Sequence, residues 1–155
     1  MYNSIGTLAH DIASGNFFYL TGSELSTQIS NTSGWLGTNL GQLNSLLYTC
    51  YTGENPDLGS EESSIFAQLY LKSYYTTKSL RVLRNIDNDA DWIRVTEGDT
   101  TLVRTNKNEV AKSYRGLSKD ADEMCKSLLS SYHSYLAMPS QVAGTDSGTG
   151  IIAYV

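Results

Sequence analysis

The chain has 155 residues, the usual length of one domain, and its hydrophobic fraction of 40% and charged fraction of 17% are low for a globular protein. All eleven Lys and Arg residues lie between Lys72 and Lys126, and the net charge of −5 argues against nonspecific DNA binding, which needs many basic contacts to phosphate. No stretch approaches the roughly 20 apolar residues of a membrane span, and the N-terminus lacks the basic start of a secretory signal, so we expect synthesis in a cytoplasm.

Residues 1–31 show no strong hydrophobic period, and we interpret them as an N-terminal arm. The apolar run Phe17–Leu20 could form a short strand, and residues 24–30 could form one or two helical turns. Because three successive aromatic side chains disfavour free exposure to water, we expect the arm to pack on the body or on a neighbouring subunit.

The first predicted helix begins with Ser33 as N-cap and continues for about 16 residues until Gly53 and Pro56 end it. Its apolar residues recur at steps of four and three: Leu36, Leu40, Leu43, Leu47 and Cys50. Cys50 and Cys125 both fall on apolar helix faces, which favours reduced, buried thiols, with a disulfide as the alternative.

A second predicted helix begins at Ser60, with Glu61 and Glu62 in the first turn, where negative charge suits the helix dipole, and Arg81 and Arg84 in the last turns. Its apolar face is wide and rich in tyrosine: Ile65, Phe66, Leu69, Tyr70 and Tyr74. The cluster formed by Tyr70, Tyr74 and Tyr75 either fills helix–helix seams or lies at an interface with another protein.

The segment from Trp92 to Arg104 has two interpretations. Gly98 and Asp99 between β-branched runs are a turn signal for a β-hairpin, whereas an irregular lead into the next helix is the alternative that we favour. The last helix is then capped by Thr105 or Asn106 and runs to about Leu136, roughly 30 residues in all. Its predicted apolar face follows a heptad rhythm: Val110, Tyr114, Leu117, Ala121, Met124, Leu128 and Tyr135.

Pro139 ends this helix, and residues 139–155 form a predicted C-terminal arm: a flexible Gly/Ser/Thr-rich stalk that closes on Ile151–Val155. Such an apolar end can add a strand to a neighbouring protein, or it can fold back on its own body. The chain as a whole is predicted to be mainly α, a small helical bundle (residues 32–138) with one long C-terminal helix and extended arms at both ends.

The sequence contains no pattern that predicts catalysis. His10 and His133 lie in different segments without ligand spacing, and the Gly-rich phosphate loop and the Gly-x-Ser-x-Gly motif are both missing. Glu97 and Asp99 could be an acid–base pair, but an exposed turn explains them better. We therefore expect a protein that is not an enzyme and that holds no metal or cofactor.

Three blocks of sequence resemble a family of small structural proteins, the head-to-tail connectors (neck adaptors) of tailed bacteriophages. They are Trp35–Asn44 continuing to Tyr51; Glu61 through Leu69–Tyr75 to Arg84; and Trp92–Asp99 with Arg104–Lys112 and Gln141–Gly144. The resemblance covers about residues 33–145, and its most distinctive part is the Glu97-Gly-Asp99 turn followed by Arg104 and the helix start at Asn106.

The resemblance implies a helical bundle that assembles with other copies into a ring, commonly about twelve, beneath the portal of the capsid. The implied partners are the portal protein and downstream neck or tail proteins, and the implied location is the neck of the virion. DNA would pass through the central channel without specific binding, which suits an acidic wall better than a basic one.

The resemblance and the arms together select the candidate interface residues: Trp92, Arg94, Glu97, Asp99, Arg104, Asn106, Lys107, Gln141, Ile151, Ile152, Tyr154 and Val155. Trp92 is expected to anchor its loop on the bundle, while the two arginines pair with the acids of the turn or with those of the next subunit. An intrachain salt-bridged loop is the alternative. Two other functions stay open, namely another virion component (capsid decoration or tail protein) and a small helical protein-binding module.

Overall fold

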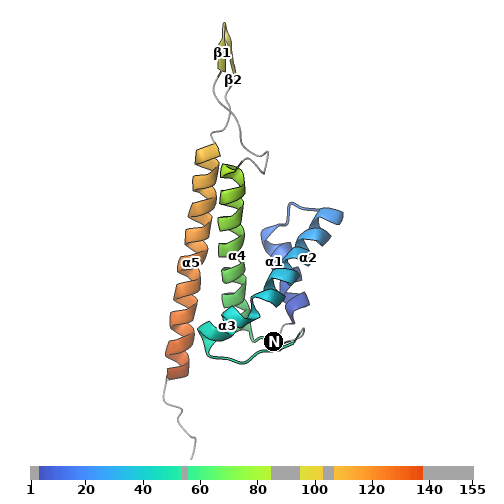
Figure 1. Cartoon of the computed structure of the whole chain (residues 1–155), viewed down its shortest axis with the longest axis vertical. Coiled ribbons are helices and arrows are strands. Elements are labelled where there is room, and N and C mark those ends of the chain that lie inside the picture. The colour runs from blue at the N-terminus through green and yellow to red at the C-terminus, as the bar shows by residue number, and fades with distance from the viewer. Residues whose placement is uncertain (1–3, 54–55, 85–94, 103–106, 138–155) are drawn as a thin grey trace, which may run out of the picture.

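The structure is a computed structural model, and it describes residues 4–53, 56–84, 95–102 and 107–137. The elements in chain order are α1 (Ile5–Asn16), α2 (Ser23–Thr38), α3 (Leu40–Leu47), α4 (Ser60–Leu83), β1 (Val95–Glu97), β2 (Thr100–Leu102) and α5 (Lys107–Ala137). Figure 1 shows α4 and α5 as a long antiparallel pair, with α1 and α2 beside α4 and α3 near the lower end. The expected mainly α fold with a long C-terminal helix is confirmed.

The N-terminal segment forms helix α1 followed by a turn at Phe17–Leu20, where the sequence had allowed a short strand. Ser4 caps α1, since its hydroxyl accepts a hydrogen bond from the Thr7 amide at 3.2 Å. The side chains on one face of this helix are buried in the main core: Ile5, Leu8, Ala9, Ile12 and Ala13. The strand prediction at Phe17–Leu20 is wrong because Phe17 is buried at the C-cap of α1, where the chain turns toward α2.

The next helix begins earlier than predicted: Gly22, eleven residues before the predicted N-cap Ser33, is the N-cap of α2, which starts at Ser23. The chain then bends at Asn39, whose side-chain amide donates to the Trp35 carbonyl at 2.9 Å, and α3 follows. The leucines of the predicted stripe are buried in both helices: Leu36, Leu40, Leu43 and Leu47. Cys50 lies beyond α3 and is exposed, so its predicted burial is wrong, whereas Cys125 is buried and both thiols are free.

Helix α4 begins at the predicted residue and has two packed sides, one against α5 and one against the α1–α2 pair. A row of aromatic rings crosses the bundle through it, with centroid separations of 5.4 Å (Trp35–Tyr70), 6.0 Å (Tyr70–Tyr74), 5.3 Å (Tyr74–Tyr75) and 6.4 Å (Tyr75–Tyr114). The row joins α2 to α4 and α4 to α5, and each neighbouring pair contributes about 0.5–1.5 kcal/mol beyond its buried area. These tyrosines therefore fill helix–helix seams.

The heptad rhythm predicted for α5 is correct, but half of its seam is displaced by one residue. Ala111, Cys125 and Tyr132 are buried, whereas Leu117 and Met124 are 44% and 52% exposed. The reason is steric, because small residues on the inner face allow two helices to approach closely. Leu117 and Met124 stay largely exposed, although the large ring of Tyr132 is buried farther along the helix.

A two-stranded antiparallel hairpin follows α4 in the chain, so the favoured irregular lead is wrong within the described residues. Val95 pairs with Leu102 and Glu97 pairs with Thr100, which leaves Gly98 and Asp99 as a two-residue turn. Gly98 has φ 62°, a conformation that glycine adopts without steric cost and that such hairpin turns require. The turn signal at Gly98 and Asp99 therefore indicated the hairpin correctly, although each strand has only three residues.

Candidate interaction surfaces

The predicted interface residues lie mostly outside the described residues. Glu97, Asp99 and Lys107 are described: Glu97 ends β1, Asp99 is exposed in the turn and Lys107 begins α5. The others fall in ranges 85–94, 103–106 and 138–155: Trp92, Arg94, Arg104, Asn106, Gln141, Ile151, Ile152, Tyr154 and Val155. The ion pairs expected of Arg94 and Arg104, and strand addition by the C-terminal arm, stay predictions.

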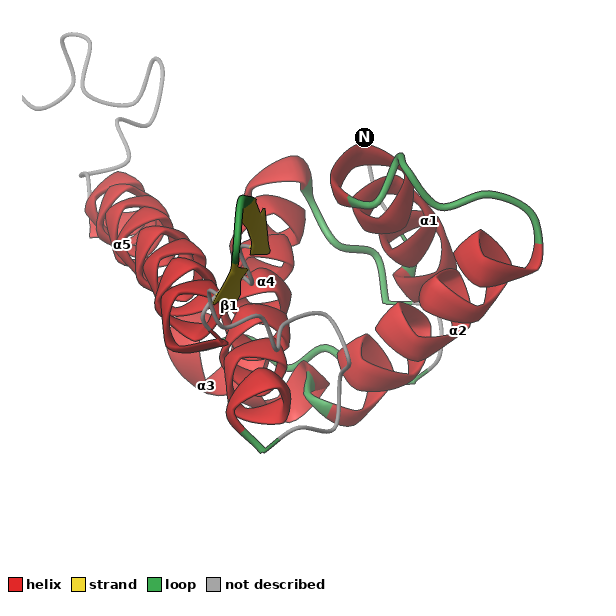
Figure 2. Cartoon of the chain, turned by 90° about the horizontal axis from the view of Figure 1, so that it is seen from above, coloured by secondary structure: helices red, strands yellow, loops and turns green. Residues whose placement is uncertain are grey.

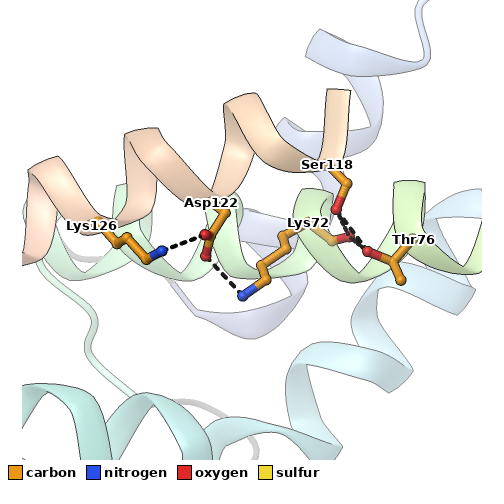
Figure 3. A network of polar contacts seen from close by, with 5 residues as sticks. All are labelled: Lys72, Thr76, Ser118, Asp122 and Lys126. Carbon is orange, nitrogen blue, oxygen red and sulfur yellow. Dashed lines mark hydrogen bonds and ion pairs between the residues drawn. The ribbon is translucent and has the colours of Figure 1, made fainter. Parts of the chain in front are cut away.

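A polar cluster links α5 to α4 (Figure 3). The Asp122 carboxylate accepts from Lys126 at 2.7 Å and from Lys72 of α4 at 2.8 Å. One turn away, the hydroxyl oxygens of Thr76 and Ser118 lie 2.7 Å apart, and Ser118 donates to the Lys72 carbonyl at 3.1 Å. Hydrogen bonds from Lys126 and Lys72 hold the pKa of Asp122 below its ordinary value, and the same carboxylate raises the pKa of Lys126.

The first candidate surface is an apolar stripe on the outside of α5, which we call the α5 flank and define as Leu117, Met124, Leu128 and Tyr135. Spacings of seven, four and seven residues place these side chains within about 40° of one another around the helix. Leu117, Met124 and Tyr135 are 44%, 52% and 67% exposed. The four residues share one face of the helix, and Leu128 is partly buried against the core.

The α5 flank lies away from α3. On the other side of α5, His133 contacts the ring of Tyr48, with centroids 5.4 Å apart, at the end of α3. The basic side chains Lys112, Arg115, Lys119 and Lys126 lie on that side as well, by the same helical spacing. The outside of α5 is therefore divided into a basic side and an apolar side.

A groove of about 240 Å³ continues the α5 flank toward the beginning of α4. Ile65, Leu128 and Tyr132 provide its apolar walls, and Ser60, Glu61, Ser64 and Ser131 complete the lining. The Tyr132 hydroxyl donates to Glu62 at 3.3 Å, and the pKa of Tyr132 is raised by burial and by the Glu62 carboxylate. Open on one side and mostly apolar, the groove suits an inserted apolar side chain.

A second groove, of about 360 Å³, lies between α2 and α4, with Trp35, Tyr70 and Tyr74 among its lining residues. The Tyr70 hydroxyl accepts from Gln28 at 2.8 Å and from the Thr32 hydroxyl at 3.1 Å. Burial raises the pKa of Tyr70 even though these hydrogen bonds act in the opposite direction, and burial also raises the pKa of Tyr74. The phenols are thus held neutral, as packing groups.

The second candidate surface is the connection between α1 and α2, where Phe18 is 77% and Tyr19 is 65% exposed; we call these two residues the loop aromatics. Phe17 anchors the connection, because it is 1% exposed and its ring lies 4.8 Å from that of Tyr74. Seen from above, α4 separates α5 from the α1–α2 pair, and the α1–α2 connection lies on the side away from α5 (Figure 2).

Sequence reasoning missed the α5 flank as a surface because it assigned the same residues to the core. The width of the apolar stripe on α5 could have revealed it. The residues that face α4 and those of the α5 flank together span a wider arc of the helix than contact with one neighbouring helix requires. For Phe18 and Tyr19 the analysis predicted packing on the body or a neighbour, and these side chains are largely exposed in the single chain.

Searches for known relatives give no support for any family. No protein-family model matches the sequence, and neither a curated protein nor a solved structure matches it. Among the described residues no three His, Cys, Asp or Glu side chains lie close enough to hold a metal ion. Within the same part of the chain, no helix combines the length and apolar character needed to cross a membrane.

Proposed function

We propose that this protein is a noncatalytic structural protein of a virion, a connector that forms a ring and joins the portal to the tail around a DNA channel. The observation that carries the proposal is the exposure of apolar side chains on two separate surfaces of a well-packed bundle, the α5 flank and the loop aromatics. Exposed apolar patches of this kind mark protein–protein contacts. The resemblance of residues 33–145 to neck adaptors gives the assembly its proposed identity.

Charge supports the passage of DNA through such a ring. The described residues 4–53 carry Asp11 and Glu24 and no Lys or Arg. A channel wall built from this part of each copy repels phosphate, so DNA passes without binding. The basic side of α5 then lies away from the channel.

The proposed partners are other copies of the chain, the portal protein and downstream neck or tail proteins. The β-hairpin and residues 138–155 are the proposed contacts to the portal or adjoining subunits, with Glu97 and Asp99 at the turn and Ile151, Ile152, Tyr154 and Val155 in the C-terminal arm. Strand addition by this arm would give main-chain hydrogen bonds and side-chain specificity together.

A small protein-binding module is the second candidate function, and the groove beside Ile65, Leu128 and Tyr132 favours it, because one apolar side chain of a partner fits there. The two candidates differ in their dependence on the C-terminal arm. Deleting residues 139–155 abolishes joining of heads to tails for a connector and leaves a binding module functional.

Electron microscopy of purified virions with a gold-labelled antibody against this chain tests the proposal. A connector gives label at one vertex, between head and tail, on intact or gently disrupted particles. Label over the shell or along the tail indicates a capsid decoration or tail protein instead. Absence of the chain from disrupted particles would overturn the virion assignment and leave the binding module.

A further inference from the structure

We infer that the segment Ile151–Val155 occupies the groove between the beginning of α4 and the end of α5 of its own chain while the protein is unassembled. The groove is the one of about 240 Å³ that Ile65, Leu128 and Tyr132 wall. The inference goes beyond the proposed function and does not depend on it, because it concerns the single chain. In this state the chain covers its own groove, so a partner that uses the groove must first displace the segment.

The first argument is the distance from the groove to the end of the last described helix. The beginning of α4 and the end of α5 lie at the same end of the antiparallel pair (Figure 1). The residues of α5 that line the groove, from Leu128 to Tyr132, precede the helix end at Ala137 by five to nine positions, which is about 8–14 Å along the helix axis. The C-terminal arm therefore begins close to the groove.

The second argument is the length of the connection. Thirteen residues, 138–150, join Ala137 to Ile151. An irregular chain of this length has a root-mean-square span of about 20 Å. A tether whose span matches the distance to its site holds the bound group at an effective concentration on the order of 1 mM, so a free peptide of equal affinity competes poorly. The hairpin lies beyond the other end of α5, about 45 Å away, where the connection would have to be almost fully extended.

The third argument is chemistry. The segment Ile151–Val155 has apolar side chains and no charged one, which suits the apolar walls of the groove. The exposed hydroxyls of Ser60, Ser64 and Ser131 on the same lining can form hydrogen bonds with the main chain of an extended peptide. Glu61 also lines the groove and disfavours an acidic occupant. An uncharged apolar segment on a short tether therefore fits the groove better than an acidic free partner.

Disulfide trapping in the full chain tests the inference. Every variant carries Cys50→Ser, which removes the exposed native thiol, and Ala153→Cys, which places a thiol in the segment. Ser131→Cys adds a second thiol on the lining of the groove. Under mild oxidation at low protein concentration, we expect this pair to form a disulfide within one chain, which mass spectrometry of the linked peptides identifies.

Ser130→Cys in place of Ser131→Cys is the matched control. Ser130 is exposed like Ser131 and has almost the same tether length, but it lies about 160° around α5 from Leu128, on the side away from the groove. The disulfide with Ser131→Cys should form at least about tenfold faster than the one with Ser130→Cys, because binding concentrates the segment at the groove alone.

A further variant separates binding from random collision of the tether. Ile151→Asp with Ile152→Asp should reduce the faster rate to that of the control, because it brings carboxylates to an apolar groove beside Glu61. Far-UV circular dichroism checks that all variants keep their helices. Equal rates at positions 130 and 131 would overturn the inference, and so would disulfides formed only between chains, because the occupant would then come from another copy. The antibody label on virions does not depend on these rates, so the proposed function is tested separately.

Discussion

Replacing Phe17 with Ala should lower the free energy of unfolding by about 3–5 kcal/mol, whereas the same change at Phe18 should alter it by less than about 0.5 kcal/mol. The two residues are adjacent and identical in type, but Phe17 is 1% exposed and Phe18 is 77% exposed. Phe17→Ala removes a whole buried ring and its edge-on contact with Tyr74, at 4.8 Å. Because a domain is stable by about 5–15 kcal/mol, the loss is a large part of the total.

Urea unfolding followed by far-UV circular dichroism measures both values. The slope of the free energy against urea should stay unchanged for Phe18→Ala. A smaller slope for Phe17→Ala would mean that the α1–α2 pair has detached before the α4–α5 pair unfolds. Equal losses for the two variants would refute the assignment of Phe17 to the core and of Phe18 to the surface.

Three further predictions concern titratable groups. Asp122→Asn should lower the urea midpoint at neutral pH and have little effect in acid. The pKa of Asp122 is lowered in the folded chain, so the stabilisation by its carboxylate is present above about pH 4 and is lost as pH falls through the folded pKa. An unchanged midpoint at neutral pH would contradict this. Cys50 should react quickly with a thiol reagent and Cys125 only after unfolding, because Cys125 is buried and burial raises the pKa of its thiol. Mass spectrometry of alkylated peptides separates the two sites. Equal reaction rates would disprove the assignment of Cys50 to the surface and Cys125 to the core. Burial raises the pKa of Tyr74 and of Tyr75, so their stabilising effect is present below about pH 10 and is lost as pH rises through the folded pKa values. Tyr74→Phe should therefore lose less stability than the unaltered chain when the pH is raised from neutral to alkaline. An equal fall in the urea midpoint of both proteins would argue against a buried phenol at position 74.

The sequence predicted the two long helices well because their signals are local and strong. Ser60 with Glu61 and Glu62 marks the start of α4, and α5 ends within one residue of the predicted Leu136. Half of the apolar face of α5 was placed one residue off, because a heptad pattern gives the period of the buried positions but does not say which of two neighbouring residues faces the partner helix. Packing decided in favour of Ala111 and Cys125, whose small size lets α4 approach.

The N-terminal helices escaped prediction for a different reason. Helix α1 buries Ile5, Leu8 and Ile12, but Gly6 and Gly15 lower its helix propensity and no acidic residue lies in its first turn. Helix propensity there is weak, so the helix depends on tertiary packing that no local pattern records. The candidate surfaces depend on packing in the same way, since the sequence alone does not show which apolar residues the core buries and which stay exposed.

The aromatic row gives the bundle a built-in optical reporter. Trp35 lies at one end of the row, 5.4 Å from the ring of Tyr70, and is itself only partly buried. Excited tyrosines at this range pass their energy to the indole, so the folded bundle should emit mainly as tryptophan. Separation of the α1–α2 pair from α4 would break the transfer and restore tyrosine emission, so rearrangement on assembly could be followed in unlabelled protein.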